Sequence, residues 1–264
     1  MLIGKAGAAQ TKIAAASPER IWVRGRDLTA DLMGGTTFTD FVYLLATSRA
    51  PTDDQRFFLN LSLVALAEHG LTPSVQAARM TLAADPAALQ GAVAAGVLGC
   101  GTVILGAADL CRALVDDVLA RTRAAGSIDE AALEVVREYR AARRPIPGYG
   151  HPLHKPVDPR AERMIALARE RRVAGRAVEA ATALTKAVAE AWGKPLPMNV
   201  SMAIAATLVD VGVPPALIRA LPILARTGGL IAHLIEEQET PIGFYLASKG
   251  EEAIDHSAAQ GASA

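Results

Sequence analysis

The chain has 264 residues and a formal charge of zero, because 27 lysines and arginines balance 27 aspartates and glutamates. A chain of this length can bury a large core within one domain plus a small appended lobe, which is enough for an enzyme. The neutral balance argues against nucleic acid or an anionic membrane surface as a partner, so a small molecule is the expected ligand.

The N-terminal residues include Lys5 and Lys12 without a continuous apolar run, so no secretory signal is expected. Cys100 and Cys111 are the only cysteines, and both lie in apolar sequence. They suit reduced thiols in the core of a cytoplasmic protein better than a disulfide framework, and no metal-ligand spacing includes them. We therefore predict a cytoplasmic protein with no metal or redox cofactor.

The first predicted elements are two short strands, at residues 11–13 and 21–25, on either side of a turn at Ser17-Pro18-Glu19. They define a β-hairpin segment over residues 1–26. From Leu28 onward, apolar residues recur at helical spacing and prolines stand where helical patterns stop or begin, which predicts about ten helices. The predicted fold class is all-α with a short N-terminal β-hairpin.

Residues 91–108 form an 18-residue stretch without a charge, which reaches the lower limit for a membrane-spanning helix. Five of these residues are glycines, so a buried helix and turn is favoured over a membrane span. Gly96, Gly99, Gly101 and Gly106 suit either close packing of helices or close approach of a ligand.

Residues 126–176 are predicted to form a small helical domain beside a large helical domain made of residues 27–125 and 177–264. Its two charged helical patterns, at residues 130–144 and 160–172, are most simply solvated faces. Between them lies the most informative segment of the chain, Ile146-Pro147-Gly148-Tyr149-Gly150-His151, which is followed by His154 and by Asp158-Pro159-Arg160.

This segment has the features of a ligand-binding loop. Gly148 and Gly150 tolerate positive φ and leave backbone groups uncovered, so a ligand can come close. Asp158 is placed to cap the helix that Pro159 opens. The cap would hold the guanidinium of Arg160 at the mouth of that helix, in a shape suited to a carboxylate.

The loop resembles the signature of the citrate synthase superfamily, and in particular of its short citryl-CoA lyase branch. Two further matches follow the family order. The segment Ala67-Glu68-His69-Gly70-Leu71-Thr72-Pro73-Ser74 is similar to the histidine-bearing helix end of the family. Its C-terminal motifs resemble Met198-Asn199-Val200 and Arg226-Thr227-Gly228-Gly229-Leu230-Ile231-Ala232-His233.

The resemblance implies an all-α, usually homodimeric enzyme whose cleft makes or breaks a carbon–carbon bond beside a CoA thioester. His69, His151 and Arg160 would hold the carboxylates and oxygen of an oxaloacetate-like 2-oxo acid, with Arg226 as a second carboxylate clamp. The backbone of residues 146–150 would bind CoA. The chemistry points the same way, because cleavage of an alcohol beside a carboxylate needs a proton acceptor near neutral pH, and His151 is the candidate.

The sequence departs from the family pattern at two places. The family's Asn-Val-Asp motif, whose acid activates the acetyl group, reads Asn199-Val200-Ser201 here, and Ile104 or Leu105 stands where a His-Gly-Gly-Ala motif would place an imidazole. Serine cannot deprotonate a thioester without a base beside it, and an aliphatic side chain cannot hydrogen-bond an enolate. Standard citrate synthesis is therefore not expected, since each group contributes on the order of 100-fold or more.

Two interpretations remain open, and the first is favoured. The chain is a CoA-dependent carbon–carbon lyase or synthase of citryl-CoA type, in which His154 supplies a replacement proton relay and Ser201 positions a water or hydrogen-bonds the thioester oxygen. Alternatively, it is an altered or inactive relative that binds CoA or a dicarboxylate. Thioester hydrolysis by Ser201 ranks last, because no base is placed near it.

Several of these residues also have a structural interpretation. His69 suits a cap at a helix C-terminus, and His154 suits a surface imidazole. His233 suits a satisfied core histidine, and Glu236 and Glu237 are interpreted as the solvated end of a helix.

Overall fold

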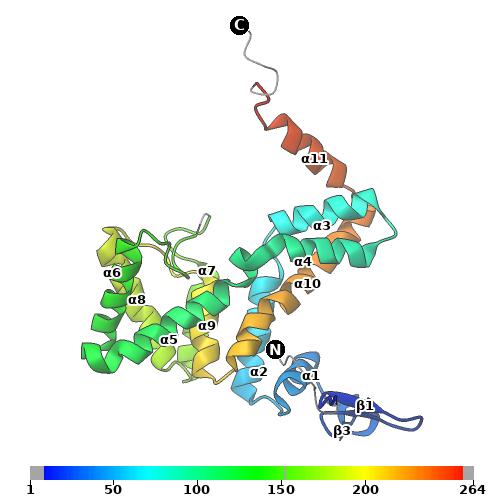
Figure 1. Ribbon diagram of the computed structural model, residues 1–264, viewed down its shortest axis with the longest axis horizontal. Helices are drawn as coiled ribbons and strands as arrows, with labels where there is room; N and C mark the ends of the chain where they lie inside the picture. Colours follow the sequence, from blue (N-terminus) through cyan, green and yellow to red (C-terminus); the bar gives the residue numbers. More distant parts are fainter. Residues whose placement is uncertain (1–8, 152, 258–264) are drawn as a thin grey trace.

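The computed structural model describes residues 9–151 and 153–257. Within these residues it contains eleven α-helices and one small sheet, so the predicted fold class is confirmed (Figure 1). In chain order the helices are α1 (Phe38–Thr47), α2 (Asp53–Ala67), α3 (Pro73–Ala84), α4 (Leu89–Leu105), α5 (Ala107–Ala125), α6 (Ile128–Ala141), α7 (Pro159–Glu170), α8 (Arg176–Trp192), α9 (Val200–Asp210), α10 (Pro215–Glu239) and α11 (Gly243–Glu252).

The N-terminal segment folds as an antiparallel sheet of β1 (Ala14–Ala16), β2 (Ile21–Val23) and β3 (Arg26–Asp27) in the order β1-β2-β3. The predicted hairpin is confirmed, although its first strand lies three residues later than expected and β3 was not predicted. A short π-helical turn, η1 (Leu28–Leu32), follows β3. Leu32 packs with Val23 and Leu44 in a small core that is separate from the main one.

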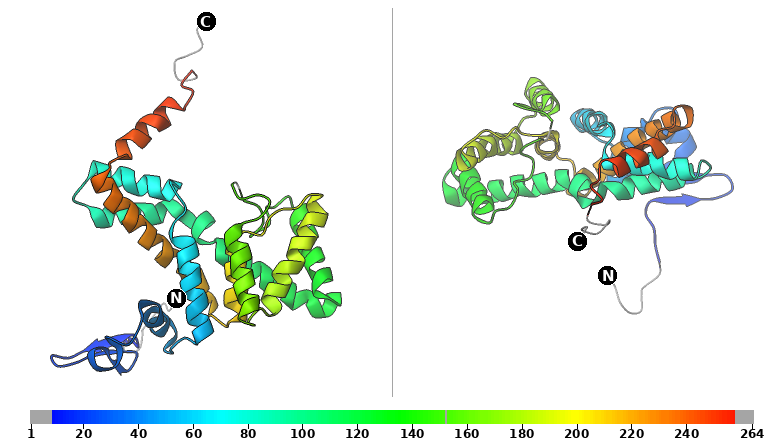
Figure 2. Two further views of the ribbon diagram at one scale, coloured as in Figure 1. Left: turned by 180° about the vertical axis from the view of Figure 1, so that it is seen from behind. Right: turned by 90° about the horizontal axis from the view of Figure 1, so that it is seen from above.

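Helices α6 to α9 gather at one end of the molecule. Helix α5 connects this lobe to α4, and the long helix α10 extends from the lobe into an arm, where it packs beside α3 and α4 (Figures 1 and 2). Helix α11 projects from the far end of the arm. One continuous apolar core includes residues of α2, α5, α6, α8, α9 and α10. The predicted division into a large and a small domain stays a prediction.

Helix starts follow the expected local signals. Thr52 and Gln55 form a capping box at the start of α2, in which each side chain satisfies a backbone N–H of the other residue. Pro73 and Pro159 occupy the first position of α3 and α7, where a missing N–H costs nothing.

The sequence suggests that residues 91–108 form either a core helix or a buried interface, and the first alternative does not hold for much of α4. Val103 and Leu98 are 84% and 80% exposed. The helical stretches Leu89–Ala125 and Pro215–Glu239 are long and apolar enough to cross a membrane by length and composition alone. The first of them is interrupted at Gly101, whose φ of 55° lies outside the helical region. Gly96 serves packing, because a Cβ there would lie 2.7 Å from the Leu230 side chain.

Candidate active site

Three imidazoles from two distant segments meet at the junction of α2, α7 and α10. The ring of His151 stacks on that of His154 with centroids 4.4 Å apart, and the ring of His69 lies edge-on to His151 at 5.5 Å. His69 comes from the loop after α2, whereas the other two come from the loop before α7. The fold thus brings together all three histidines singled out by the sequence.

Hydrogen bonds fix the proton of His151. Its Nδ1 accepts the backbone N–H groups of Leu153 at 3.1 Å and of His154 at 2.9 Å. The neutral ring therefore carries its proton on Nε2. Nε2 lies 3.5 Å from Nη2 of Arg160, so two donors face the same space. An oxygen of a bound carboxylate or alkoxide suits that space.

Asp158 holds Arg160 in place, as the sequence predicted. The carboxylate caps α7 by accepting the backbone N–H of Arg160, and it also accepts from Nε and Nη2 of the same side chain at 3.1 and 2.9 Å. It accepts the N–H of Val200 as well, which ties α7 to the start of α9. Burial alone would raise the pKa of Asp158, but the bonds and charge of Arg160 lower it below its usual value.

The glycine-rich loop forms a short ribbon with the segment before α9. Gly150 donates its N–H to the carbonyl of Pro197, and the N–H of Asn199 donates to the carbonyl of Gly148. Gly148 has φ +82°, and a Cβ there would lie 2.7 Å from Met202, so this glycine serves packing. Gly150 has φ +90° and nothing within 4 Å of its Cβ position, so a ligand can approach the backbone there without displacing side chains.

Ser201 lies in the first turn of α9, directly beyond this ribbon. Asn199 caps α9 by accepting the Ser201 N–H, and its side-chain nitrogen donates to the carbonyl of Gly150. Among the described residues, the hydroxyl of Ser201 forms no hydrogen bond with the three histidines. Ile104 lies near the end of α4 and is half-buried.

One face of α10 supports the loop that carries His69. Arg226, Gly229 and His233 are spaced by three and four residues, so they lie on the same side of the helix. A Cβ at Gly229 would lie 1.9 Å from the carbonyl oxygen of Ala67, so only glycine permits this approach. One turn further along α10, Nε2 of His233 lies 2.8 Å from a carboxylate oxygen of Glu68.

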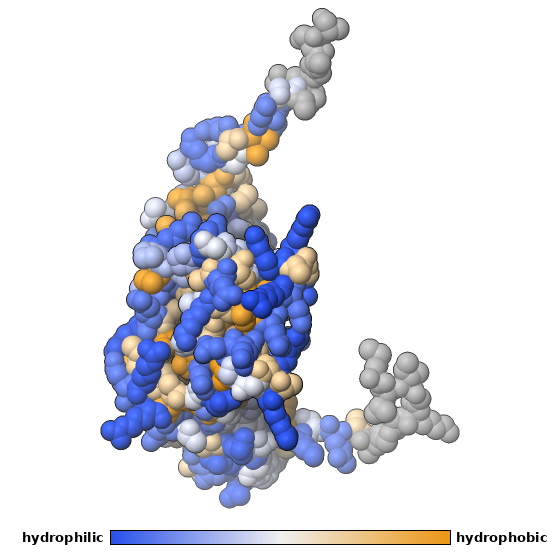
Figure 3. Space-filling view, turned by 90° about the vertical axis from the view of Figure 1, so that its left-hand side faces the viewer, coloured by the Kyte–Doolittle hydropathy of each residue, from blue (hydrophilic) through white to orange (hydrophobic). Residues whose placement is uncertain are grey.

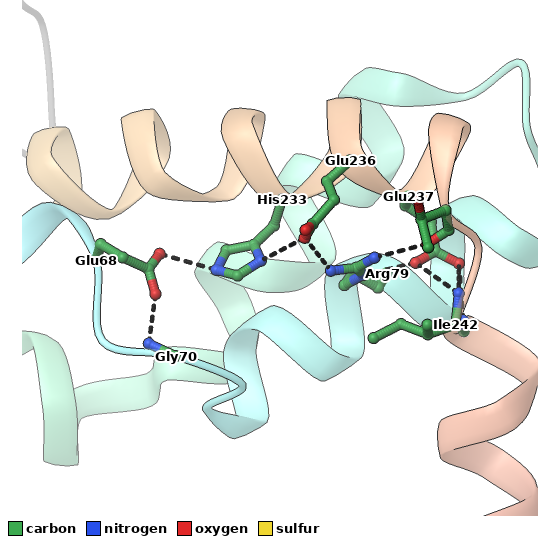
Figure 4. A network of polar contacts seen from close by, with 9 residues as sticks. Glu68, Gly70, Arg79, His233, Glu236, Glu237 and Ile242 are labelled. Atoms are coloured by element: carbon green, nitrogen blue, oxygen red, sulfur yellow. Dashed lines mark hydrogen bonds and ion pairs between the residues drawn. The ribbon is translucent and has the colours of Figure 1, made fainter.

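A chain of charged groups extends from this contact along α10 (Figure 4). The other oxygen of Glu68 accepts the N–H of Gly70, which closes the loop around His69. Nδ1 of His233 is buried without a hydrogen-bond partner in the described structure, and it lies 3.9 Å from Glu236. The interpretation of His233 as a satisfied core histidine is wrong, because its side chain is partly exposed and its Nδ1 has no partner among the described residues. Sequence reasoning also missed its contact with Glu68, because no local pattern links the two residues.

The interpretation of Glu237 as solvated is wrong. Glu237 is 3% exposed and pairs with the equally buried Arg79 at 2.5 Å. The backbone N–H groups of Ile242 and Gly243 donate to the same carboxylate, so Glu237 also fixes the start of α11. Charge patterning could not reveal this pair, because Arg79 lies 158 residues earlier in the chain.

The electrostatic character of the site suits an anion. Burial, followed by the nearby charges of Arg160 and Arg226, lowers the pKa of His69, and burial with His154 lowers that of His151. Burial also lowers the pKa of Arg226, which forms no ion pair with any described residue. Because the Arg160 charge is already matched by Asp158, the Arg226 guanidinium is the unmatched charge of the site.

Comparison with known proteins identifies the family. A family model described as citrate synthase, C-terminal domain, matches residues 9–243. A solved structure of citryl-CoA lyase from Hydrogenobacter thermophilus is 31% identical, with a TM-score of 0.78 over 88% of each chain. The chain belongs to the citrate synthase family. The two matches confirm the predicted resemblance, and they support a citryl-CoA lyase or citrate synthase-like function for the chain.

More distant members of the citrate synthase family share the fold. The ATP citrate lyase of Methanothrix soehngenii, solved with citrate and coenzyme A, is 22% identical with a TM-score of 0.74, and the match covers 90% of this chain and 40% of that one. The citrate synthase of Thermoplasma acidophilum, solved with carboxymethyl coenzyme A and oxaloacetate, is 21% identical with a TM-score of 0.64 over 78% and 54% of the chains. No curated protein matches the chain.

Proposed function

We propose that the protein makes or breaks a carbon–carbon bond between an acyl-CoA and an oxaloacetate-like 2-oxo acid, with citryl-CoA as the reference substrate. The observation that carries this proposal is the cluster of three imidazoles and two guanidiniums, in which, among the described residues, Arg160 alone has a carboxylate partner. Such a cluster attracts a small anion with several oxygens, as a 2-oxo dicarboxylic acid is.

The oxo acid would be held from both sides. Arg226 on α10 would bind one carboxylate and Arg160 on α7 the other, since a guanidinium fork matches a carboxylate in shape. The proton on Nε2 of His151 would be donated to the oxygen attached to the reacting carbon. A neutral imidazole can donate there without adding a charge, in agreement with its lowered pKa.

Cleavage needs a proton acceptor, and the sequence-based candidate for that role, His151, instead presents a donor at Nε2, because its Nδ1 accepts two backbone N–H groups. We assign that role to His154, whose ring stacks on His151 at 4.4 Å. The ring centroid of His69 lies 5.5 Å from that of His151 and 6.2 Å from that of His154, so His69 would be a second binding imidazole. The hydroxyl proton moves to His154 as the C–O double bond forms. The carbon–carbon bond breaks, its electron pair passes to the α-carbon of the thioester, and a proton then converts this enolate to the acyl-CoA.

The acyl side of the proposed site lacks the acid and the imidazole that the family pattern supplies. The hydroxyl of Ser201 can donate a hydrogen bond to the thioester oxygen or position a water there, although it cannot act as a base. CoA would run along the ribbon of residues 146–150, where Gly150 leaves open space. The departures at Ser201 and at Ile104 or Leu105 favour the second candidate, a relative that binds CoA or a dicarboxylate without turnover.

Incubation of the purified protein with citryl-CoA and with citramalyl- and malyl-type CoA esters tests the proposal. We expect mass spectrometry to detect an acyl-CoA and its 2-oxo acid, and His151→Ala to lower the rate by about 100-fold or more. His256→Ala is the matched control, because His256 is exposed and far along the chain in the segment after α11. Binding of CoA or oxaloacetate without product from any ester would establish the second candidate instead.

We also propose that the protein is a homodimer and is located in the cytoplasm. Exposed apolar side chains on α4, such as Leu98 and Val103, and on α10, such as Ile235, are unusual for a monomer surface and suit a subunit interface. Both cysteines are free and buried, which suits a reducing compartment. Sedimentation of the wild type as a dimer and of Leu98→Lys as a monomer would support the interface; a monomeric wild type would contradict it.

A further inference from the structure

The loop between α2 and α3 has few hydrogen bonds of its own. This segment, the His69 loop, spans residues 68–72. Among the described residues, its one internal backbone hydrogen bond joins residues 70 and 72, and the side chain of Gln76 donates to the carbonyl of Leu71 near its end. The position of the His69 ring therefore depends on side-chain contacts between the loop and the neighbouring helices.

Glu68 connects the His69 loop to α10. One of its carboxylate oxygens accepts the N–H of Gly70, and the other lies 2.8 Å from Nε2 of His233. Glu68 thus binds the residue that follows His69 and is itself bound by α10. Its side chain is 54% exposed and that of His233 is 14% exposed, so without the imidazole the carboxylate could turn into solvent.

The ring of His233 also faces a carboxylate on its own helix. Its Nδ1 lies 3.9 Å from Glu236, and Nη1 of Arg79 lies 2.6 Å from the same carboxylate. Figure 4 shows this row of groups, which runs from Glu68 through His233 and Glu236 to Arg79. Both ring nitrogens of His233 therefore face carboxylate oxygens, which are hydrogen-bond acceptors.

Arg79 is the fixed end of the row. It is buried, and it donates from Nε to the buried Glu237 at 2.5 Å and from Nη2 to the carbonyl of Thr240 at 3.0 Å. Buried apolar residues of α3, α4 and α10 form a small core in the same arm. Hydrophobic residues also show where α11 leaves the arm, whereas the side of the lobe is largely hydrophilic (Figure 3). Charges in apolar surroundings attract each other strongly, so Arg79 holds its partners firmly.

His233 shares its helix with the proposed carboxylate clamp. Arg226 and His233 are seven residues apart, so they lie on the same side of α10. Because one helix carries both residues, the contact between His233 and Glu68 sets where the His69 loop lies relative to Arg226. His69 and Arg226 are proposed ligands of the same 2-oxo acid, so their separation affects its binding.

We propose that His233 is a positioning residue for the 2-oxo acid. It holds the carboxylate of Glu68, and through it the His69 loop, at a fixed place relative to Arg226, and it does not touch the substrate. The inference rests on the proposed function and extends it to a residue that acts through Glu68.

Titration calorimetry with oxaloacetate tests this role. His233→Ala should bind oxaloacetate about 3- to 5-fold more weakly than the wild type, as loss of a partly exposed charged contact predicts. His233→Gln should restore most of the affinity, because its amide nitrogen is a donor that can replace Nε2. Gln238→Ala is the matched control, because it removes an exposed polar side chain from the same helix, and it should bind like the wild type.

A double variant tests whether His233 acts through Glu68. His233→Ala/Glu68→Ala should bind oxaloacetate no more weakly than Glu68→Ala alone, since residues that act as one unit are not additive. Additive losses of affinity would overturn the inference, because His233 would then act by another route.

Hydrogen exchange read by mass spectrometry follows the His69 loop without a ligand. The loop should exchange faster in His233→Ala than in the wild type or in Gln238→Ala. If the wild type binds no oxaloacetate, the proposed function fails, and the exchange rates alone decide whether His233 holds the loop. Unchanged exchange in His233→Ala would overturn the inference. Faster exchange with unchanged affinity for oxaloacetate would overturn it as well, because His233 would then stabilise the loop without a role in binding.

Discussion

The histidine cluster is held on two sides by different kinds of contact. On the α7 side, His151 and Arg160 are fixed by bonds within the loop, from the N–H groups of Leu153 and His154 and from Asp158. On the α10 side, His69 is fixed by contacts between residues far apart in the sequence. Glu68 and His233 are 165 positions apart, and Gly229 packs on the carbonyl of Ala67.

The two halves of the proposed site therefore depend on different kinds of contact: the α7 side on contacts between residues close in sequence, and the α10 side on the packing of distant helices. Short-range bonds around Asp158 can form as soon as α7 begins, because the carboxylate caps that helix. The shape of the His69 loop depends on the packing of α10 against α2. The first half therefore depends on one buried carboxylate, and the second depends on the fit between two helices.

Replacement of Asp158 by alanine should have the largest effect. It removes the cap of α7, both bonds to the Arg160 side chain and the acceptor of the Val200 N–H, all from a side chain that is fully buried. We expect the free energy of unfolding to fall by about 3 to 5 kcal/mol in urea titrations. Asp158→Asn is the control that retains an acceptor, and it should lose less. Unchanged stability of the alanine variant would show that the α7 side is not held by this carboxylate.

Replacement of Gly229 by alanine tests the fit on the α10 side. The added Cβ would lie 1.9 Å from the Ala67 oxygen, which must move and carry the His69 loop with it. We expect a loss of about 2 kcal/mol in stability, typical of overpacking, and weaker binding of oxaloacetate. Gly228→Ala is the matched control, because nothing lies within 4 Å of its Cβ position, and it should stabilise α10 slightly. Equal stability and equal affinity for oxaloacetate in the two variants would contradict a close fit between Gly229 and the carbonyl of Ala67.

The free energy of unfolding should depend on acidic pH through two buried carboxylates, Asp158 on the α7 side and Glu237 on the α10 side. Arg160 and Arg79 lower the folded-state pKa of Asp158 and Glu237, although burial alone would raise them. Their stabilisation is thus complete above the ordinary values of 3.8 and 4.5 and is lost as the pH falls through the lowered ones. Each contributes a slope of at most about 1.4 kcal/mol per pH unit.

Urea unfolding between pH 3 and 6 measures these slopes in the wild type, Asp158→Asn and Glu237→Gln. Each variant should show a flatter decline at low pH than the wild type. A Glu237→Gln variant with the wild-type slope would show that the Arg79 pair makes no pH-dependent contribution to stability.

The same division explains what could be predicted from the sequence. The capping role of Asp158, the helix start at Pro159 and the placement of Arg160 are confirmed, because the residues that cause them lie within three positions of one another. The Glu68–His233 contact and the burial of Glu237 depend on which helices meet, and a single sequence contains no local sign of that. Glu236 and Glu237 were both interpreted as solvated; Glu236 is 59% exposed, whereas Glu237 is buried.

The exposed face of α4 shows a related limit. An uncharged stretch rich in valine, leucine and glycine predicts burial, but the sequence does not tell whether the burying partner is the same chain or another copy. Within the described residues, α4 packs mainly on α3 and α10 through small residues such as Gly96, and Leu98 and Val103 remain outside. The stretch is apolar, as interpreted. Of its two suggested locations, a core helix is contradicted at Leu98 and Val103, and a buried interface between copies stays a prediction.

Replacement of Glu68 by alanine should have the smallest effect on stability and a specific effect on binding. Glu68 is exposed, so loss of its bond to His233 should cost less than about 1 kcal/mol. Because the same carboxylate accepts the Gly70 N–H, its loss frees the loop around His69. We expect the KM for the 2-oxo acid to rise about 3- to 10-fold with little change in kcat, as a weakened hydrogen bond to bound substrate predicts. Glu68→Gln, which keeps an acceptor, should restore most of the affinity, and Glu239→Ala on α10 is the control. A fall in kcat without a change in KM would mean that the α10 side supports the chemical step and not binding of the oxo acid.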